Sequence, residues 1–274
     1  MSPRAGATTW EHLAEVSYAG RAAIAQGTRP LGEISSRQLR FSTVYAQPLS
    51  QQTTFLAGLG WQRLEFSPPA GSPVPDHLGS VALKLGCNHQ FTPQWSGRLE
   101  IDPGLYSDFA GGTSGGDFNA PMALRLIYAA SRDVQWAGGV NLDFRSGIPV
   151  FGGIGVRWQF APDWTLLLLL PAPRVEYAIA SGVTLFAGAA LRGGTFRVAP
   201  DYGRKRGRPE LDNQNVDYRE ITIGAGVRWQ LKPGLALNAG AGRMLDRRFE
   251  FEKRNLLLNG DGAPSLQLTL TGAF

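Results

Sequence analysis

Apolar and polar residues alternate along most of the chain, from residue 34 to its end. The alternation is clearest in the last ten residues, where Leu266, Leu268 and Leu270 fall on one face of an extended strand and the residues between them are polar. A period of two is typical of β-strands, and here it recurs in short segments separated by turn residues. The pattern therefore predicts an all-β chain.

The N-terminal part is less regular. Residues 1–9 are expected to be disordered, Trp10 to Ala19 is expected to form a first strand, and the segment from Gly20 to Gly32 is ambiguous, with an interior plug as one interpretation. No charge run or low-complexity linker divides the rest of the chain. We therefore expect a single domain over 10–274.

The connections between the expected strands alternate between tight and long. Longer polar loops are expected at 67–78, 107–120, 199–217 and 252–264. Tight turns are expected at Pro48–Ser50, Thr92–Gln94, Ser131–Asp133, Ala161–Asp163, Ser181–Gly182 and Lys232–Gly234. Short turns at one end and longer loops at the other are typical of transmembrane β-barrels of the bacterial outer membrane.

The strand face opposite the apolar residues is rich in glycine and in isolated charges of both signs. This composition is typical of a barrel lumen, whereas the outer face of a soluble β-sandwich, the alternative fold, would carry more Lys, Glu and Ser. A charge facing lipid at mid-depth would cost about 2–4 kcal/mol, so these residues are expected to face inward. The candidate lumen-lining residues are Arg98, Glu100, Asp102, Arg125, Asp143, Arg157, Arg174, Glu176, Arg192, Glu220 and Arg228.

Aromatic residues gather near the tight turns. An indole ring is stable at the level of the lipid headgroups, so aromatics near the turns predict an interfacial girdle at one rim of the barrel. The residues concerned are Trp95, Trp136, Trp158, Trp164, Trp229, Phe91, Phe160 and Phe274.

The segment from Trp164 to Ala178 decides the number of strands. Read as one strand, it gives an odd total and moves the long 199–217 loop to the end with the tight turns. A turn at Pro171–Pro173 divides it into two short strands, which agrees with the poor fit of proline within a strand. We therefore predict a closed antiparallel transmembrane β-barrel of fourteen strands, an even number as in most bacterial barrels, with twelve strands as the alternative.

The composition excludes several other classes of protein. The net charge is +5, but the basic residues are scattered singly apart from Gly203–Arg208, so no nucleic-acid partner is expected. No apolar run approaches the roughly 18–20 residues of a transmembrane helix. The single Cys87 excludes an intrachain disulfide. The residues after Met1 lack the apolar stretch of a signal peptide; because an outer-membrane protein is exported, we expect that its natural signal has been removed.

Three neighbouring segments carry a family resemblance. They are Ile148-Pro-Val-Phe-Gly-Gly-Ile-Gly-Val-Arg-Trp158, Pro162-Asp-Trp164 and Leu170-Pro-Ala-Pro-Arg-Val-Glu-Tyr177. Together with the hairpin from Phe41 to Phe66 and the terminal strand, they resemble an uncharacterised family of outer-membrane β-barrel proteins from Gram-negative bacteria. The resemblance covers most of the chain from residue 38. It implies the barrel fold and the outer-membrane location, and it supplies no catalytic or ligand-binding residues.

The terminal strand also resembles the assembly signal of outer-membrane barrels. Leu266, Leu268, Leu270 and the final Phe274 form its apolar face. The resemblance implies that the barrel-assembly machinery is a partner of this strand, and the expected fold adds membrane lipids and lipopolysaccharide as partners.

Candidate catalytic chemistry is sparse. The three histidines, His12, His77 and His89, fall in no recognisable catalytic pattern, so we expect no enzyme activity and no catalytic residues. No metal-ligand spacing is present, and Gly111–Gly116 lacks the Lys-Ser/Thr of a phosphate-binding loop. No metal and no cofactor is expected.

These observations favour a passive channel or solute transporter of the outer membrane with an Arg-rich polar lumen and a weak preference for anions. The alternatives are a non-conducting structural or partner-binding barrel and, third, a membrane-embedded lipid hydrolase. The basic stretch Gly203–Arg208 lies in the longest expected outer loop, where it could meet lipopolysaccharide phosphates or be balanced by Glu210, Asp212 and Asp217.

Overall fold

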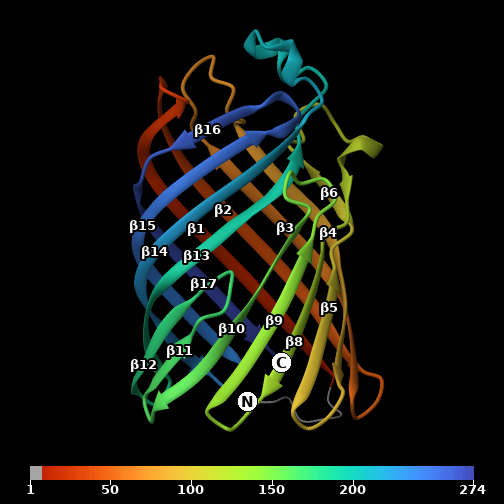
Figure 1. Cartoon of the computed structure of the whole chain (residues 1–274), viewed down its shortest axis with the longest axis vertical. Helices are drawn as coiled ribbons and strands as arrows, with labels where there is room; N and C mark the ends of the chain where they lie inside the picture. Colours follow the sequence, from red (N-terminus) through yellow and green to blue (C-terminus); the bar gives the residue numbers. More distant parts are fainter. Residues whose placement is uncertain (1–7) are drawn as a thin grey trace.

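The computed structural model describes residues 8–274, which form a closed β-barrel (Figure 1). Its wall contains seventeen strand segments joined in one sheet. They are β1 (Thr9–Gln26), β2 (Arg29–Pro48), β3 (Thr53–Phe66), β4 (His77–Gln90), β5 (Trp95–Ile101), β6 (Gly104–Ser107), β7 (Phe118–Asn119), β8 (Met122–Ala129), β9 (Val134–Leu142), β10 (Val150–Ala161), β11 (Trp164–Leu167), β12 (Arg174–Ala180), β13 (Val183–Arg197), β14 (Asn215–Lys232), β15 (Leu235–Phe251), β16 (Leu256–Gly260) and β17 (Ala263–Ala273).

Three wall strands are interrupted, and each is made of two segments. The pairs are β5 with β6, β7 with β8, and β16 with β17, because both members of each pair run along the same neighbouring strand. The barrel therefore has 14 antiparallel strands, as predicted, and the twelve-strand alternative is wrong. The predicted turn at Pro171–Pro173 lies between β11 and β12 and separates the two shortest uninterrupted wall strands.

The last strand closes the barrel against the first. In this antiparallel pairing Val16 lies opposite Leu268. At the end of the chain the backbone groups of Trp10 and Phe274 form two hydrogen bonds, of 2.6 and 2.9 Å. The closure that the sequence pattern predicts is therefore made by the first and last strands.

The ambiguous N-terminal segment belongs to the wall. Residues from Gly20 onward continue β1, turn at Gly27 and Thr28, and return in β2. Gly27 has φ +58°, a left-handed conformation that glycine adopts without strain. The interpretation of this segment as a plug is wrong for the part of the chain that the structure describes. Most of the predicted disordered stretch, 1–9, lies outside the described residues, and Thr9 already belongs to β1.

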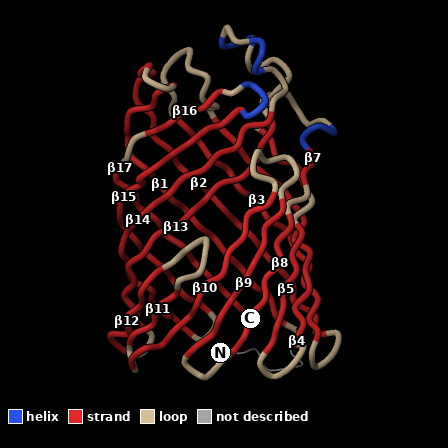
Figure 2. The backbone as a smooth tube through the Cα atoms, viewed as in Figure 1, coloured by secondary structure: helices blue, strands red, loops and turns tan. Residues whose placement is uncertain are grey.

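The six tight turns expected from the sequence lie at the end of the barrel opposite the long loops, whereas the turn at Gly27 and Thr28 lies at the loop end (Figure 2). The long loops contain four short 3₁₀ helices: η1 (Gly115–Asp117), η2 (Arg204–Arg206), η3 (Pro209–Leu211) and η4 (Glu252–Arg254). A further connection at this end, 143–149 between β9 and β10, was not singled out by the sequence pattern.

The interior at the loop end is filled by a hydrophobic cluster, which we call the cap core. Its rings pack across the barrel, because Phe66 of β3 contacts Phe249 of β15 at 4.9 Å and Tyr218 of β14 at 5.2 Å between ring centroids. Its buried members are Ile24, Ile34, Leu64, Phe66, Val74, Leu78, Phe196, Val198, Ala199, Tyr202, Leu211, Val216, Tyr218, Phe249, Phe251, Leu256 and Leu258. The expectation of a polar interior therefore holds only below this core.

Strands from opposite parts of the wall meet at the loop end. β6 pairs antiparallel with β4, and Ser107 at its end forms a parallel bridge with Arg197 of β13. Asp108 N–H and Ser107 Oγ both donate to the carbonyl of Arg197, at 3.0 and 3.1 Å. This contact narrows the barrel above β8–β12 and closes it around the cap core.

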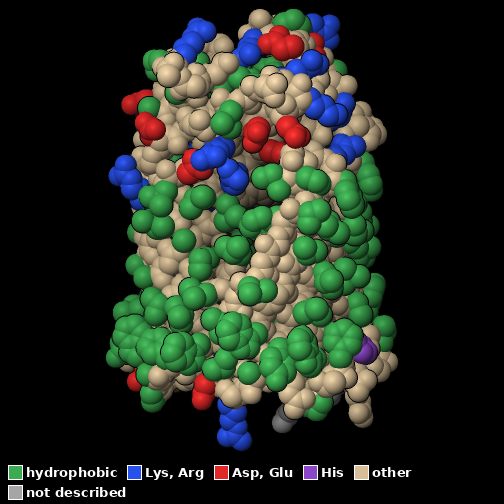
Figure 3. Space-filling view, viewed as in Figure 1, with side chains coloured by type: hydrophobic (Ala, Val, Ile, Leu, Met, Phe, Trp, Pro, Cys, Tyr) green, Lys and Arg blue, Asp and Glu red, His purple; other side chains and the backbone are tan. Residues whose placement is uncertain are grey.

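The outer surface has an apolar band with aromatic residues at the tight-turn end (Figure 3). Trp95, Trp136, Trp158, Trp164 and Trp229 are all 40% or more exposed, as a lipid-facing girdle requires. Several of them pack on tyrosines, including Trp164 on Tyr177 at 4.6 Å and Trp95 on Tyr128 at 4.8 Å between ring centroids.

No helix among residues 8–274 is long and apolar enough to cross a membrane.

Candidate functional site

A cavity of about 440 Å³ occupies the lumen beneath the cap core, which it meets at Leu64. Its wall comes from β1, β2, β3, β12, β13, β14, β15 and β17, together with Pro171 and Ala172 of the β11–β12 turn. Many lining positions on β13, β14 and β15 are Gly or Ala, so the small side chains leave this volume open. The lining therefore combines small residues and a few charges with larger apolar side chains such as Phe186 and Leu64.

Four arginines and two glutamates carry the charges of this lining. Arg192 of β13 lies 3.5 Å from both Glu15 of β1 and Glu220 of β14, and all three side chains are less than a fifth exposed. The phenol of Tyr218 donates to Glu220 at 2.6 Å. The remaining lining arginines are Arg40, Arg174 and Arg228.

A buried arginine lies between this charged group and the cap core. The side chain of Arg247 is fully buried, and its Nη2 donates to Ser36 Oγ at 2.6 Å. Its Nε and Nη1 have no hydrogen-bond acceptor among the described residues. Because Arg247 lies opposite Glu220 of the lining and bonds Ser36 of the lining, its positive charge adds to that of the lining arginines.

The predicted lumen residues fall into several groups. Arg174, Arg192, Glu220 and Arg228 line the cavity. Arg174 also pairs with Glu176 at 2.7 Å.

A second group lies on β5 and β8, away from the cavity lining. Glu100 accepts from Arg98 at 2.8 Å and also pairs with Arg125, and Asp102 pairs with Lys84. Asp143 accepts from Asn119 and from the backbone of Arg145, both at 3.0 Å. Arg157 has no ion-pair partner in the described part of the chain.

Sequence reasoning missed Glu15, Arg40 and Arg247 as candidate residues. The period of two does place Glu15 and Arg40 on the inward face of β1 and β2, so the alternation could have identified them. Arg247 was hidden by a bulge. Ile221 pairs with Asp246 and Thr222 with Met244, so Leu245 is an extra residue that reverses the facing of the residues after it.

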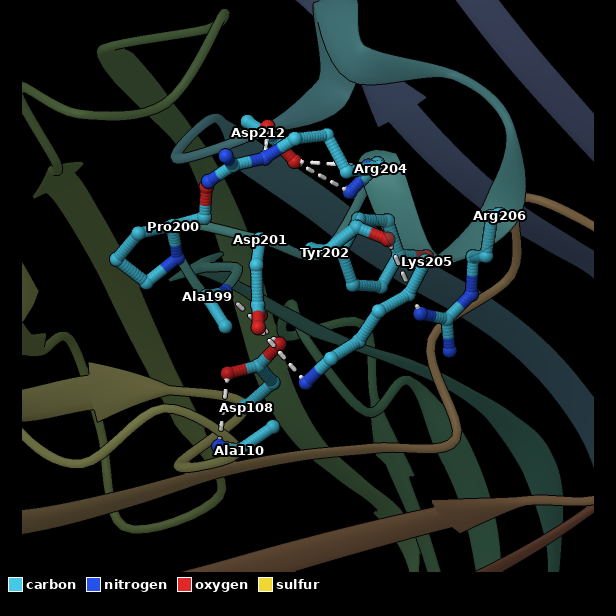
Figure 4. A network of polar contacts seen from close by, with 11 residues as sticks. Asp108, Ala110, Ala199, Pro200, Asp201, Tyr202, Arg204, Lys205, Arg206 and Asp212 are labelled. Carbon is cyan, nitrogen blue, oxygen red and sulfur yellow. Dashed lines mark hydrogen bonds and ion pairs between the residues drawn. The ribbon is translucent and has the colours of Figure 1, made fainter.

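The long loop between β13 and β14 covers the cap core and is held by acidic residues (Figure 4). Asp108 accepts from the backbone of Ala199 at 2.9 Å, and Asp212 accepts from Gly203 and Arg204 at 2.8 and 3.0 Å. The phenol of Tyr202 donates to the carbonyl of Pro73 at 2.8 Å, and burial raises the pKa of this phenol.

Each basic residue of Gly203–Arg208 has an acidic partner. The pairs are Arg204 with Asp212, Lys205 with Asp201, Arg206 with Asp76 and Arg208 with Glu210, at 2.7 to 2.9 Å. The hydrogen bond from Lys205 lowers the pKa of Asp201. The basic stretch is therefore balanced by Asp201 and the expected Glu210 and Asp212 of its own loop and by Asp76 of the β3–β4 loop. Asp217 instead binds Ser146, Gly147 and Thr195.

Tyr202→Phe should lower the free energy of unfolding by about 0.5–1.5 kcal/mol, the net value of one hydrogen bond. The phenylalanine keeps the ring in the cap core and removes only the donor to Pro73. Urea unfolding in detergent checks the value against wild type. Lys205→Ala, on the exposed side of the loop, is the control. If Tyr202→Phe lowers the free energy of unfolding no more than Lys205→Ala does, the bond to Pro73 does not stabilise the loop.

Two of the three histidines lie on the outer face near the tight-turn end. Nδ1 of His12 is 3.0 Å from Thr43 Oγ1, and Nδ1 of His89 is 2.9 Å from Thr53 Oγ1. His77 opens β4 at the loop end. None has a carboxylate partner in the described part of the chain, and among residues 8–274 no cluster of His, Cys, Asp and Glu could hold a metal ion.

Comparison with solved structures shows the same architecture. A mutant of the TodX monoaromatic hydrocarbon channel is similar with a TM-score of 0.52 and 10% identity, over 97% of this chain and 90% of that chain. An outer-membrane channel from Pseudomonas putida F1 is similar with a TM-score of 0.52 and 10% identity, over 100% of this chain and 99% of that chain. The chain therefore has the fold of outer-membrane channel barrels.

Comparison of sequences identifies the family. No curated protein matches the chain. A family model described as a domain of unknown function, DUF6268, matches residues 51–259, which is more than half of the chain. This confirms the resemblance to an outer-membrane barrel family without an assigned function: the chain belongs to the DUF6268 family.

Proposed function

We propose that this protein is a passive channel for small solutes in the bacterial outer membrane. The observation that carries the proposal is the cavity of about 440 Å³ inside a closed barrel, with charged and small residues in its lining, which comes from eight wall strands. A barrel that served only as a structural element would gain stability by filling this volume with side chains. The apolar outer band and the aromatic girdle support the membrane location.

The charge of the lining supports a preference for anions. Four arginines face two glutamates around the cavity, and the buried Arg247 adds a further positive charge nearby. Charged rings in a low-dielectric wall select ions of the opposite sign. The names of the two similar structures, a hydrocarbon channel and an outer-membrane channel, are consistent with a transport role.

A non-conducting structural barrel is the second candidate, and the cap core favours it. The core fills the loop end from β3 to β15, so a wide axial pore does not run through this barrel. Under either function we propose that the barrel-assembly machinery recognises the terminal strand and that lipids and lipopolysaccharide surround the wall.

Proteoliposomes separate the two candidates. The channel should allow a small organic anion to leave loaded vesicles faster than protein-free vesicles do, and faster than a cation of the same size. Equal leakage with and without correctly folded protein would support the structural barrel and remove the channel.

Arg228→Glu should strongly weaken the anion preference. Arg228 lines the cavity and has no acidic partner among the described residues, and its replacement leaves three arginines and three glutamates in the lining, with Arg247 as the one excess positive charge nearby. The reversal potential in a salt gradient measures the change and should move toward the value for no selectivity. Arg132→Glu, in an exposed tight turn outside the cavity lining, is the matched control and should leave the potential unchanged.

A further inference from the structure

The wall of the barrel is incomplete above the β11–β12 hairpin. β10 extends over Val150–Ala161, but β11 pairs with it only at Arg157, Trp158 and Ala161. On the other side, β12 pairs with β13 only from Val183 to Gly188. The hairpin therefore ends about halfway up its two neighbours and leaves their upper edges apart.

Peptide groups of both strands point into this gap. Val156 accepts from Leu168, so Ile154 and Gly152, which have the same facing, direct their N–H and C=O groups toward the gap. Leu191 donates to the carbonyl of Pro171, so Gly193, the next residue with this facing, directs its peptide groups into the gap from β13. The described residues give Ile154, Gly152 and Gly193 no strand partner on that side.

Unpaired backbone cannot be left facing lipid. At membrane depth it persists only where it is buried in protein or lines a water-filled space. A hairpin a few residues longer would have paired these groups. Their exposure is thus explained if the gap is an aqueous opening.

The opening has a frame on all four sides, and we call it the lateral window. Its sides are residues 150–155 of β10 and 191–194 of β13, and its lower edge is the hairpin tip Leu168–Pro173, to which Leu191 is bonded at the corner. Its upper edge is the loop 143–149, which is tied across to β14. There Asp217 accepts from Gly147 N–H at 2.7 Å and from Ser146 Oγ at 3.0 Å.

The window lies at the upper limit of the apolar band. On the outer face of β14, Ile223 and Ile221 are followed by Arg219 and Asp217, so lipid-facing side chains give way to charged ones at this level. In the pairing with β13, Gly193 lies opposite Arg219. Figure 3 shows this face hollowed just above the hydrophobic band, with acidic and basic side chains around the hollow.

The window also borders the lumen cavity. Pro171 and Ala172 of its lower edge and Leu191 and Arg192 of its side belong to the cavity lining. The cap core closes the axial direction above the cavity. The cavity is therefore closed toward the loop end by the cap core and open sideways through the window.

We propose that the lateral window is a portal between the lumen and the outer leaflet of the membrane, for small amphipathic molecules with an apolar body and an anionic head. The proposal rests on the channel function and adds its route and its substrate class. Because the window opens toward the membrane, it gives access to molecules that partition into the lipid.

The side chains at the window match such a molecule. Leu168 and Leu170 on the lower edge are about half exposed, and Ile154 beside them is 87% exposed, so the approach from the membrane is apolar. Arg174 and Arg192 lie directly inside, at positions adjoining the lower edge and the side. An apolar body can follow the leucines while its anionic head meets the arginines.

Gly153 offers a way to narrow the window. A Cβ at this position would meet only Leu170 Cδ1, at 3.7 Å, so a larger side chain fits without disturbing the wall and lies against the lower edge. Gly138 on β9 is a matched control, because its Cβ would also meet only ordinary contacts, with Ile154 Cγ2 at 3.7 Å and the carbonyl of Gly153 at 3.9 Å. Gly138 lies on the lipid face, one strand away from the window.

The test measures the transfer of 8-anilinonaphthalene-1-sulfonate, a fluorescent amphipathic anion, into proteoliposomes. Wild type and Gly138→Phe should transfer it faster than protein-free vesicles, and Gly153→Phe should reduce the rate severalfold. Leu170→Ala, which shortens the lower edge, should raise the rate. Heat-modifiable migration on a gel confirms that each variant is folded.

The outcomes separate the portal from the channel. Transfer by Gly153→Phe at the wild-type rate, with Leu170→Ala also unchanged, would overturn the portal and leave the channel standing. Absence of transfer of both this anion and the small organic anion by folded wild type would overturn the channel, and the portal with it. Opposite effects of the two window variants, with Gly138→Phe unchanged, would support the portal, because general damage to the wall cannot raise and lower the rate.

Discussion

Replacing residues 200–212 by two glycines should turn a poorly conducting barrel into one with large, stable conductance steps. The loop they form contributes Tyr202 and Leu211 to the cap core, and both side chains are almost fully buried there. Without them the core loses its upper layer, and ions gain an axial path from the lumen to the loop end. Single-channel recording in planar bilayers measures the change.

The replacement is designed to leave the strands intact. Asn213 N–H donates to the carbonyl of Ala199 at 3.1 Å, and Val198 N–H donates to Gln214 at 2.9 Å, so the loop ends are already held together. Two glycines between residues 199 and 213 make a two-residue hairpin turn, for which glycine is well suited. The variant should therefore fold.

Lys205→Ala is the control for this experiment. Its side chain is 59% exposed and pairs with Asp201 at 2.9 Å, so its loss changes the loop charge without removing a member of the cap core. Conductance should stay at the wild-type level. If the shortened variant also conducts like wild type, the cap core is not what closes the axial path, and the lateral route loses its main support.

The alternation of the sequence predicted most of the wall. The alternation holds where each face of a strand keeps the same environment, lipid outside and lumen inside. In β1, for example, Val16 and Tyr18 face outward and Glu15 faces the cavity. It also identified the hairpin at Pro171–Pro173, because proline interrupts strand pairing for a local reason. Local chemistry of this kind is readable from a single sequence.

The cap core could not be predicted in the same way. Phe249 and Phe251 are fully buried inside the barrel, because the bulge at Leu245 reverses the facing of the strand by one residue. Phe66 falls in the inward register of β3 with Leu64, so the alternation gives its facing, but its contact with Phe249 across the lumen is not readable from the sequence. An aromatic side chain that faces lipid and one that faces an apolar plug look alike in sequence.

The window was hidden for a different reason. The sequences of its edges look like those of paired strands, because the gap comes from the absence of a neighbouring strand. That β11 and β12 are too short to pair with the whole of their neighbours is seen only once those neighbours are known. Arg174 and Arg192 were expected in the lumen from their facing alone. Their position beside an opening follows from the register of β12 and β13, in which Arg174 lies opposite Gly188.

Replacing the terminal Phe274 by alanine should lower the yield of membrane-inserted barrel strongly and the stability of the folded barrel little. The ring is 55% exposed, and its neighbours are Lys232, whose Nζ is 5.4 Å from the ring centroid, and the His12 ring at 6.3 Å. The two hydrogen bonds with Trp10 involve only backbone atoms, so alanine retains them. Little folded-state energy is therefore lost with the ring.

The effect on yield is expected if the ring acts before the barrel closes. An exposed terminal aromatic on the apolar face of the last strand can be recognised while that strand is still unpaired. Phe91→Ala is the matched control, because Phe91 is also 55% exposed and lies near the same rim, in the turn after β4. Insertion is measured as the heat-modifiable fraction in outer membranes, and stability as the urea midpoint of purified barrels. If both alanine variants insert equally well, Phe274 contributes only to the girdle and is not an assembly signal. In that case, deletion of Phe274, which also removes the backbone bonds to Trp10, should lower the urea midpoint but leave the inserted fraction unchanged.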